Sequence, residues 1–195
     1  HFERAGLFKV VRDRYQCRDV LYPGCSVHIT PSLYFPHVMY VDQSQAAARF
    51  FVDQTPLLEF VNRNKHYKQS TYIRFIQHDY SQPLPIMEVT FDLLLSLFAE
   101  GIASSCANYL KPGGLLLTNN HRGDALEAVK DHHLSLNAVI QFHKGEYAIV
   151  EEGMHGRNIP VQKSNSHYLK QVNQGVEYVE HELYYFLNVR TEPVN

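Results

Sequence analysis

The sequence predicts an α/β fold, in which a mainly parallel sheet of about seven strands carries helices on both faces. The first observation behind this prediction is that short apolar runs of strand length alternate with segments of helical periodicity along most of the chain. The second is a pair of β-rich runs around Lys144-Gly145-Glu146, which predicts an antiparallel hairpin. With 195 residues, the chain is expected to form one domain, 1–195, whose core is residues 19–151.

Five runs rich in apolar and β-forming residues have the length of strands. In chain order these predicted strands are 20–22, 38–41, 71–77, 91–96 and 115–118. The hairpin adds two more, at 134–142 and 147–151. Strands that alternate with helices pair in parallel, and ligands of such sheets lie at the carboxyl ends of the strands.

Helical spacing occupies most of the remaining segments. The predicted helices are 1–18, packed on the sheet edge, then 45–64, 99–109, 124–132 and 168–189. Pro56 is expected to divide the second helix, and Gly113-Gly114 to turn the chain from the third helix into the next strand. Asp124 is expected to cap the fourth helix. Prolines leave only a short or irregular crossover at 27–36, and residues 153–168 are expected to form a loop.

Composition and charge limit the classes of protein to which the chain can belong. Hydrophobic residues make up 45% of it, which excludes a disordered or fibrous chain. The formal net charge of −2 provides no overall basic field, so no nucleic acid is expected as a partner. The three cysteines lack disulfide or zinc spacing, and no apolar run approaches the ~20 residues that cross a bilayer. We therefore expect a cytoplasmic protein with no membrane partner.

Four segments, in order and spacing, resemble the class I S-adenosylmethionine-dependent methyltransferases, whose fold is Rossmann-like. They are Val20-Leu-Tyr-Pro-Gly24-Cys-Ser in the place of the glycine-rich loop, Val38-Met-Tyr-Val-Asp42, Gln77-His-Asp79-Tyr80, and Phe91 to Ser96 followed by Tyr109-Leu-Lys-Pro-Gly-Gly-Leu-Leu-Leu117. The last segment is the most specific of the four. The hairpin also resembles the antiparallel sixth and seventh strands of that family.

The resemblance implies that S-adenosylmethionine binds at the carboxyl ends of the strands and donates a methyl group to an unidentified small-molecule acceptor. The residues implied to hold this cofactor are Tyr22, Gly24, Cys25, Asp42, Gln43, Asp79, Tyr80 and Ser96. Gly24 would let the backbone approach the ligand closely. Asp42 can accept both ribose hydroxyls, and Asp79 can accept from the adenine amine while Tyr80 packs on the ring.

Simpler interpretations of the same residues keep two other hypotheses open. Gly24 can be a plain turn, Asp42 a helix cap and Asp79 a solvated loop acid. The family's loop begins with an acid that helps hold the cofactor's amino group, whereas Tyr22 or Pro23 stands there in this chain. That departure motivates the alternative of a catalytically inactive methyltransferase-like binding or scaffold protein. A nucleotide-binding oxidoreductase is a third hypothesis, although G-x-G-x-x-G is missing.

No catalytic residue and no metal site follow from the sequence. Glu100, His121 and His155 are candidate general bases without further support. The histidines do not form a zinc-binding spacing, and Asn119-Asn120 match only part of the pattern of metal-dependent O-methyltransferases. The C-terminal segment 153–195 is expected to cover the cleft or to form a partner surface, which leaves a homo-oligomer open.

Overall fold

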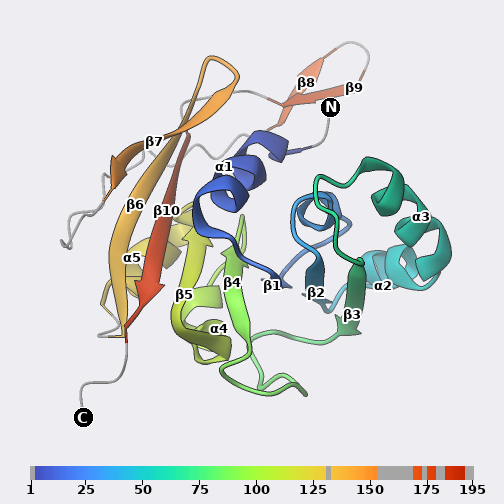
Figure 1. Cartoon of the computed structure of the whole chain (residues 1–195), viewed down its shortest axis with the longest axis horizontal. Coiled ribbons are helices and arrows are strands. Elements are labelled where there is room, and N and C mark those ends of the chain that lie inside the picture. The colour runs from blue at the N-terminus through green and yellow to red at the C-terminus, as the bar shows by residue number, and fades with distance from the viewer. Residues whose placement is uncertain (1–2, 131–132, 153–168, 173–174, 179–182, 192–195) are drawn as a thin grey trace.

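An eight-stranded sheet with the strand order β3-β2-β1-β4-β5-β10-β6-β7 forms the centre of the computed structural model (Figure 1). The structure describes residues 3–130, 133–152, 169–172, 175–178 and 183–191. The strands of the sheet are β1 Asp19–Pro23, β2 His37–Asp42, β3 Tyr72–Gln77, β4 Phe91–Ser96, β5 Leu110–Thr118, β6 Leu134–His143, β7 Glu146–Glu152 and β10 Leu183–Arg190. A two-stranded hairpin, β8 Leu169–Val172 and β9 Gly175–Tyr178, pairs separately.

The direction of the strands gives the sheet one shared carboxyl edge. β3, β2, β1, β4 and β5 pair in parallel, so their carboxyl ends lie side by side. β10 runs antiparallel between β5 and β6, and β7 is the antiparallel partner of β6. The predicted α/β fold with a mainly parallel sheet is therefore confirmed.

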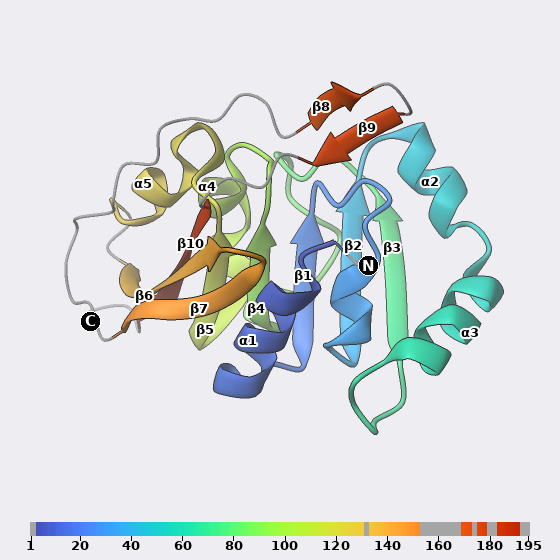
Figure 2. The same ribbon diagram turned by 90° about the horizontal axis from the view of Figure 1, so that it is seen from above.

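Helices cover both faces of the sheet, as expected. They are α1 Ala5–Tyr15, α2 Gln45–Phe51, α3 Gln54–Asn64, α4 Ile102–Cys106 and α5 Asp124–Ala128, with 3-10 turns η1 Thr30–Leu33, η2 Ala107–Tyr109 and η3 His121–Gly123. On one face, Phe8 of α1 and Val61 of α3 belong to the same buried cluster as Val20. On the other, Ile102 of α4 packs in a cluster with Leu21. Figure 2 shows α1 and α4 on opposite faces of the sheet. Among the described residues, no helix is long and apolar enough to cross a membrane.

The helical half of the first face agrees with the prediction in part. α1 packs on the edge strand β7, where Gly6 lies against the ring of Tyr147, and its buried side chains also join the central cluster of that face. The break in segment 45–64 falls before Asp53, whose carboxylate accepts from the Thr55 amide (3.1 Å) and begins α3. Pro56 lies within the first turn of α3, where its missing N–H removes no helical hydrogen bond. The crossover predicted to be short is the single turn η1.

The glycine pair 113–114 has a role that differs from the predicted turn. The chain leaves α4 through η2, and β5 already begins at Leu110. Gly113, with φ of 75°, lies inside β5, where the pairing jumps from Phe91–Leu110 to Leu93–Leu115. The glycines therefore lie in a bulge within β5: Gly113 adopts a positive φ that other residues adopt only at a cost, and a β-carbon at Gly114 would lie 2.8 Å from the Lys111 carbonyl oxygen.

The C-terminal segment contradicts the predicted helix 168–189. It contains β8, β9 and β10 instead. β10 inserts between β5 and β6 and pairs antiparallel with both. The hairpin itself is confirmed: β6 and β7 pair through Lys144 and Gly145, whose φ values of 51° and 88° are typical of a tight hairpin turn. The loop predicted at 153–168 lies outside the described residues.

Candidate functional site

The loops at the carboxyl edge contain an unusual share of strained backbone. Ser26 after β1, Phe98 after β4 and Asn120 after β5 have φ values of 49°, 59° and 56°. Arg4, which precedes α1, has φ of 55°. Each such residue costs roughly 1–3 kcal/mol, and in folded proteins these residues gather at functional sites. The carboxyl edge is therefore the candidate site on backbone geometry as well as on topology.

Asp42 ends β2 and fixes the loop that follows β1. Its Oδ2 accepts from the Ser26 amide and its Oδ1 from the Ser44 amide, both at 2.8 Å. Ser44 in turn caps α2 by accepting from the Ala47 amide (3.2 Å). The cap of α2 is thus Ser44 and not Asp42. Each carboxylate oxygen keeps a further lone pair, so Asp42 can still accept from a ligand.

Gly24 is crowded by side chains of this chain. A β-carbon at Gly24 would lie 3.0 Å from Cβ of Ala99 and 3.4 Å from Cε1 of Tyr80, and Gly24 has φ of 64°. The Tyr80 hydroxyl donates to the carbonyl of Glu100 at 3.2 Å. Tyr80 therefore reaches from the loop after β3 to the loop after β4, and it passes beside Gly24 on the way. The close packing and the positive φ together disfavour any side chain at position 24 without reference to a ligand.

Tyr22 or Pro23 stands where the resembling family has an acid, and Tyr22 is 2% exposed. Its hydroxyl lies 3.0 Å from Nδ1 of His28. Burial raises the pKa of Tyr22 and is the first cause that lowers the pKa of His28 to about 4, with the Arg4 charge as the second. Both groups are consequently uncharged near pH 7.

Arg4 brings a buried positive charge to this edge, which the sequence did not indicate. Its guanidinium lies 4.2 Å from the centroid of the Phe98 ring and 2.5 Å from the carboxylate of Glu3, and its side chain is 14% exposed. Burial lowers the pKa of Arg4, but Tyr185, Tyr22 and Glu3 raise it by more, so the guanidinium stays charged. In the sequence Arg4 was one of several basic residues in a predicted helix, and nothing there distinguished it.

Ser96 is fully buried, and its hydroxyl is bonded within the protein. Its Oγ donates to Oδ2 of Asp124, which also accepts from Thr118 Oγ1 (3.4 Å) and, at Oδ1, from the Ala103 amide (3.1 Å). Asp124 is 1% exposed, and burial raises its pKa although these hydrogen bonds lower it in part. The expected cap role of Asp124 is wrong, because Gly123 is the N-cap of α5. Asp124 joins the ends of β4 and β5 to the start of α4.

The other predicted cofactor residues lie around Asp42. Cys25 is buried, which raises the pKa of its thiol, and its amide points to the carbonyl of Val41. Gln43 is exposed. Asp79 is partly exposed and accepts from the Ser81 amide (2.9 Å), which holds the pKa of Asp79 below its ordinary value.

Two of the three candidate general bases, Glu100 and His121, lie in the part of the chain that the structure describes. Glu100 forms an ion pair with Arg122 at 2.6 Å on the surface. Burial, and then the charge of Arg122, lower the pKa of His121. His155 lies outside the described residues. No group of three or more potential metal ligands occurs in the part of the chain that the structure describes.

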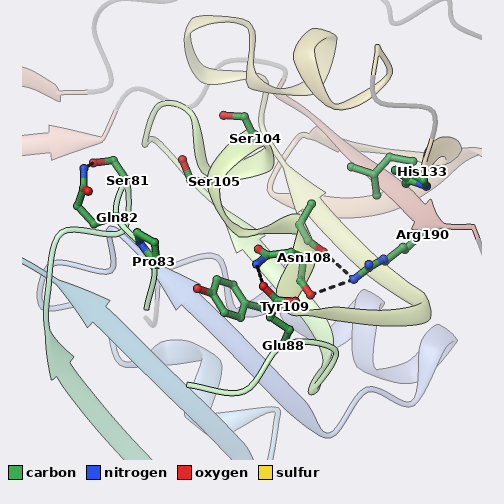
Figure 3. A pocket seen from close by; sticks show the side chains of 12 residues that line it. Ser81, Gln82, Pro83, Glu88, Ser104, Ser105, Asn108, Tyr109, His133 and Arg190 are labelled. Atoms are coloured by element: carbon green, nitrogen blue, oxygen red, sulfur yellow. Dashed lines mark hydrogen bonds between the residues drawn. The ribbon is translucent and has the colours of Figure 1, made fainter. Parts of the chain in front are cut away.

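Two surface hollows formed by described residues lie away from the predicted site. One, of about 410 Å³, lies near the start of β5, where Glu88, Asn108 and Arg190 are among its lining residues (Figure 3). Its polar groups are engaged with each other: Asn108 donates to Glu88 (2.8 Å) and Arg190 to main-chain carbonyls. The other, of about 390 Å³, is lined by Asp92 and Lys111 at the amino ends of the strands. None of the residues predicted to hold the cofactor lines either hollow.

Comparison with solved structures relates this architecture to known proteins. A candidate methyltransferase from Bacillus halodurans C-125 superposes with a TM-score of 0.53 and 14% identity over 95% of this chain and 97% of that one. A second neighbour is geranyl diphosphate C-methyltransferase from Streptomyces coelicolor A3(2), solved with Mg²⁺, geranyl diphosphate and S-adenosyl-L-homocysteine. Its TM-score is 0.52 and its sequence identity 14%, over 71% of this chain and 63% of that one. The [4+2]-cyclase SpnF superposes with a TM-score of 0.51 and 15% identity, over 70% of this chain and 59% of that one.

These similarities concern the fold, because every identity is below 20%, a level at which sites and substrates diverge. This chain spans less than two thirds of the cyclase and of the Streptomyces enzyme. No family model and no curated protein sequence matches it. The order of strands, the inserted antiparallel strand and the helices on both faces, together with these neighbours, identify the architecture: the chain has the class I methyltransferase fold.

Proposed function

We propose that the chain binds S-adenosylmethionine along the carboxyl edge of its sheet and transfers the methyl group to a small-molecule acceptor. The observation that carries this proposal is the placement of Asp42. Its carboxylate lies at the end of β2, beside the loop after β1, and retains lone pairs that can accept two vicinal ribose hydroxyls. The complex of the Streptomyces neighbour with S-adenosyl-L-homocysteine supports the same ligand class.

The remaining predicted residues fit successive parts of the donor. Gln43 lies beside the ribose position, and Asp79 and Tyr80 border the space beyond β3 where adenine would lie. Gly24 and Cys25 belong to the loop over which the 5′ substituent would run. Because Tyr80 packs beside Gly24, binding requires the ring of Tyr80 to turn away from the loop.

The chemistry would be direct displacement at the sulfonium methyl. The chain's contribution would be to hold the acceptor nucleophile in line with the methyl group and to exclude water, which together account for much of the rate of such a step. Ser96 has a supporting part in this scheme: through Asp124 it holds the loops after β4 and β5, which border the acceptor space.

A calorimetric titration of the intact protein with S-adenosylmethionine and S-adenosylhomocysteine tests the proposal. Asp79→Ala removes an acceptor for the adenine amine and should weaken the binding of both ligands, because that donor is then left without its partner. Asp53→Ala is the control, because Asp53 also accepts from the amide two residues on but lies at the exposed start of α3. Absence of binding at millimolar ligand would refute the donor site, and equal affinities for the two variants would refute the role of Asp79.

The second candidate function is that of a catalytically inactive binding protein with this fold. It is favoured by Tyr22 and Arg4, since an uncharged phenol and a cation occupy the region where the resembling family has an acid. The two candidates are distinguished by product formation. An enzyme converts bound S-adenosylmethionine to S-adenosylhomocysteine when a mixture of candidate acceptors is supplied, whereas a binding protein returns the ligand unchanged.

A further inference from the structure

The order of strands sets the direction in which a nucleoside would lie at this edge. Asp42 and Asp79 follow β2 and β3, while β1 and then β4 come next in the sheet. A nucleoside whose ribose is bound at Asp42 and whose base lies toward β3 must therefore direct its 5′ substituent over β1 toward β4. This step rests on the function proposed above, and it places the 5′ group beside the side chains that follow β1 and β4.

Arg4 is the charged group that the 5′ substituent would meet there. It lies on the ring of Phe98, two residues beyond the end of β4, and its charge acts on Tyr22 near the end of β1. The guanidinium is largely removed from water, and its backbone is held in the left-handed region. A charge in such surroundings acts over a longer range than one in solvent, because less water screens it.

Arg4 has two polar partners of its own, an ion pair with Glu3 at 2.5 Å and a hydrogen bond with the side chain of Tyr185. The Glu3 side chain is 34% exposed against 14% for Arg4, so its charge is the more strongly screened by water of the two. Among the described carboxylates of this edge, Asp42 is bonded to two loop amides and Glu100 is paired with Arg122. Asp124 is buried, and its raised pKa shows how poorly that position tolerates ionisation.

We infer that Arg4 makes this site select the charge of the 5′ substituent, so that adenosine derivatives with an uncharged 5′ thioether bind more tightly than those with a cationic sulfonium. The ligand class is an adenine nucleoside whose 5′ group carries no net positive charge. S-adenosylhomocysteine and S-adenosylmethionine are suitable probes, because they differ by one methyl group and by the charge it creates.

The test is the ratio of the two dissociation constants, measured calorimetrically on the full chain at low salt. The wild type should bind S-adenosylhomocysteine about tenfold or more tightly, as expected for one partly screened charge pair. Arg4→Gln should bring the ratio near one, and Arg4→Lys should preserve it. Glu3→Gln should raise the ratio, because it removes the compensating charge. Lys9→Gln, an equal loss of charge on the exposed side of α1, should leave it unchanged.

The outcomes separate this inference from the function on which it rests. If neither probe binds at millimolar concentration, the nucleoside site is absent and both proposals fail. If both probes bind but their ratio is the same in wild type and in Arg4→Gln, the nucleoside site stands and the selection by Arg4 is refuted. Opposite shifts in Arg4→Gln and Glu3→Gln, with no shift in Lys9→Gln, are the result that supports it.

Discussion

Replacing Asp124 with alanine should destabilise the protein far more than the loss of an ordinary surface acid. The substitution leaves the Ala103 amide without its acceptor in a buried position, at a cost of about 1–3 kcal/mol. The hydroxyls of Ser96 and Thr118 lose their acceptor as well, which adds about 0.5–1 kcal/mol each, since hydroxyls can rotate to other partners. Relief of the buried charge offsets part of this loss. The expected net decrease in unfolding free energy is about 2–4 kcal/mol.

Urea unfolding at pH 7 measures this decrease, with Asp53→Ala as the control. Asp53 is an exposed cap of α3, so its loss should cost only about 1 kcal/mol. The two variants should have similar m-values, because both lose stability without a change in the surface exposed on unfolding. If Asp124→Ala costs no more than Asp53→Ala, Asp124 does not join β4, β5 and α4 in the way described.

The remaining predictions concern the crowded glycine and the acid at the amino ends of the strands. Gly24→Ala should cost about 1–2 kcal/mol more than Gly145→Ala, because both have positive φ but only the β-carbon at position 24 would meet Ala99; equal urea midpoints would contradict this. Burial raises the pKa of Asp92, but main-chain amides and Lys111 lower it by more, so its folded pKa lies below the unfolded value of about 4. Its stabilisation is therefore present above pH ~4 and is lost as the pH falls through the folded pKa. Asp92→Asn should reduce the fall in unfolding free energy as the pH is lowered, measured by urea unfolding at several pH values. An unchanged dependence on pH would exclude this contribution of Asp92 to stability.

The parallel half of the fold was predictable because its strands are locally distinctive. Runs such as Leu93–Leu95 are continuously apolar, as a strand buried on both faces requires, and Leu95 and Leu94 indeed lie in the clusters on opposite faces. Segment 183–190 was assigned to a helix although Tyr, Phe, Leu and Val fill it. Its place as a strand is decided by pairing with β5 and β6, residues more than forty positions away, and such non-local pairing overrides local periodicity.

The role of Asp42 as a ribose acceptor follows from the resemblance and stays a prediction. The structure excludes its alternative role as the cap of α2, which belongs to Ser44. Arg4 was missed because its importance depends on Phe98, which is distant in sequence and close only in the folded chain. Asp124 was misassigned for the same reason: acids often precede short helices, and its partner Ser96 is 28 residues away.

The internal bonding of the edge determines what a ligand can gain there. Asp42 already bonds to the Ser26 and Ser44 amides, so the loop after β1 has its shape without a ligand and loses little entropy on binding. Because both carboxylate oxygens of Asp42 already accept hydrogen bonds, a ribose would add further hydrogen bonds but would not provide a partner to a group that lacks one. Turning Tyr80 away from Gly24 breaks the hydrogen bond from its hydroxyl to the Glu100 carbonyl and removes the packing of its ring beside Gly24. If the chain binds a nucleoside as proposed, affinity would come mainly from the 5′ substituent, which is the part of the ligand on which the charge of Arg4 would act.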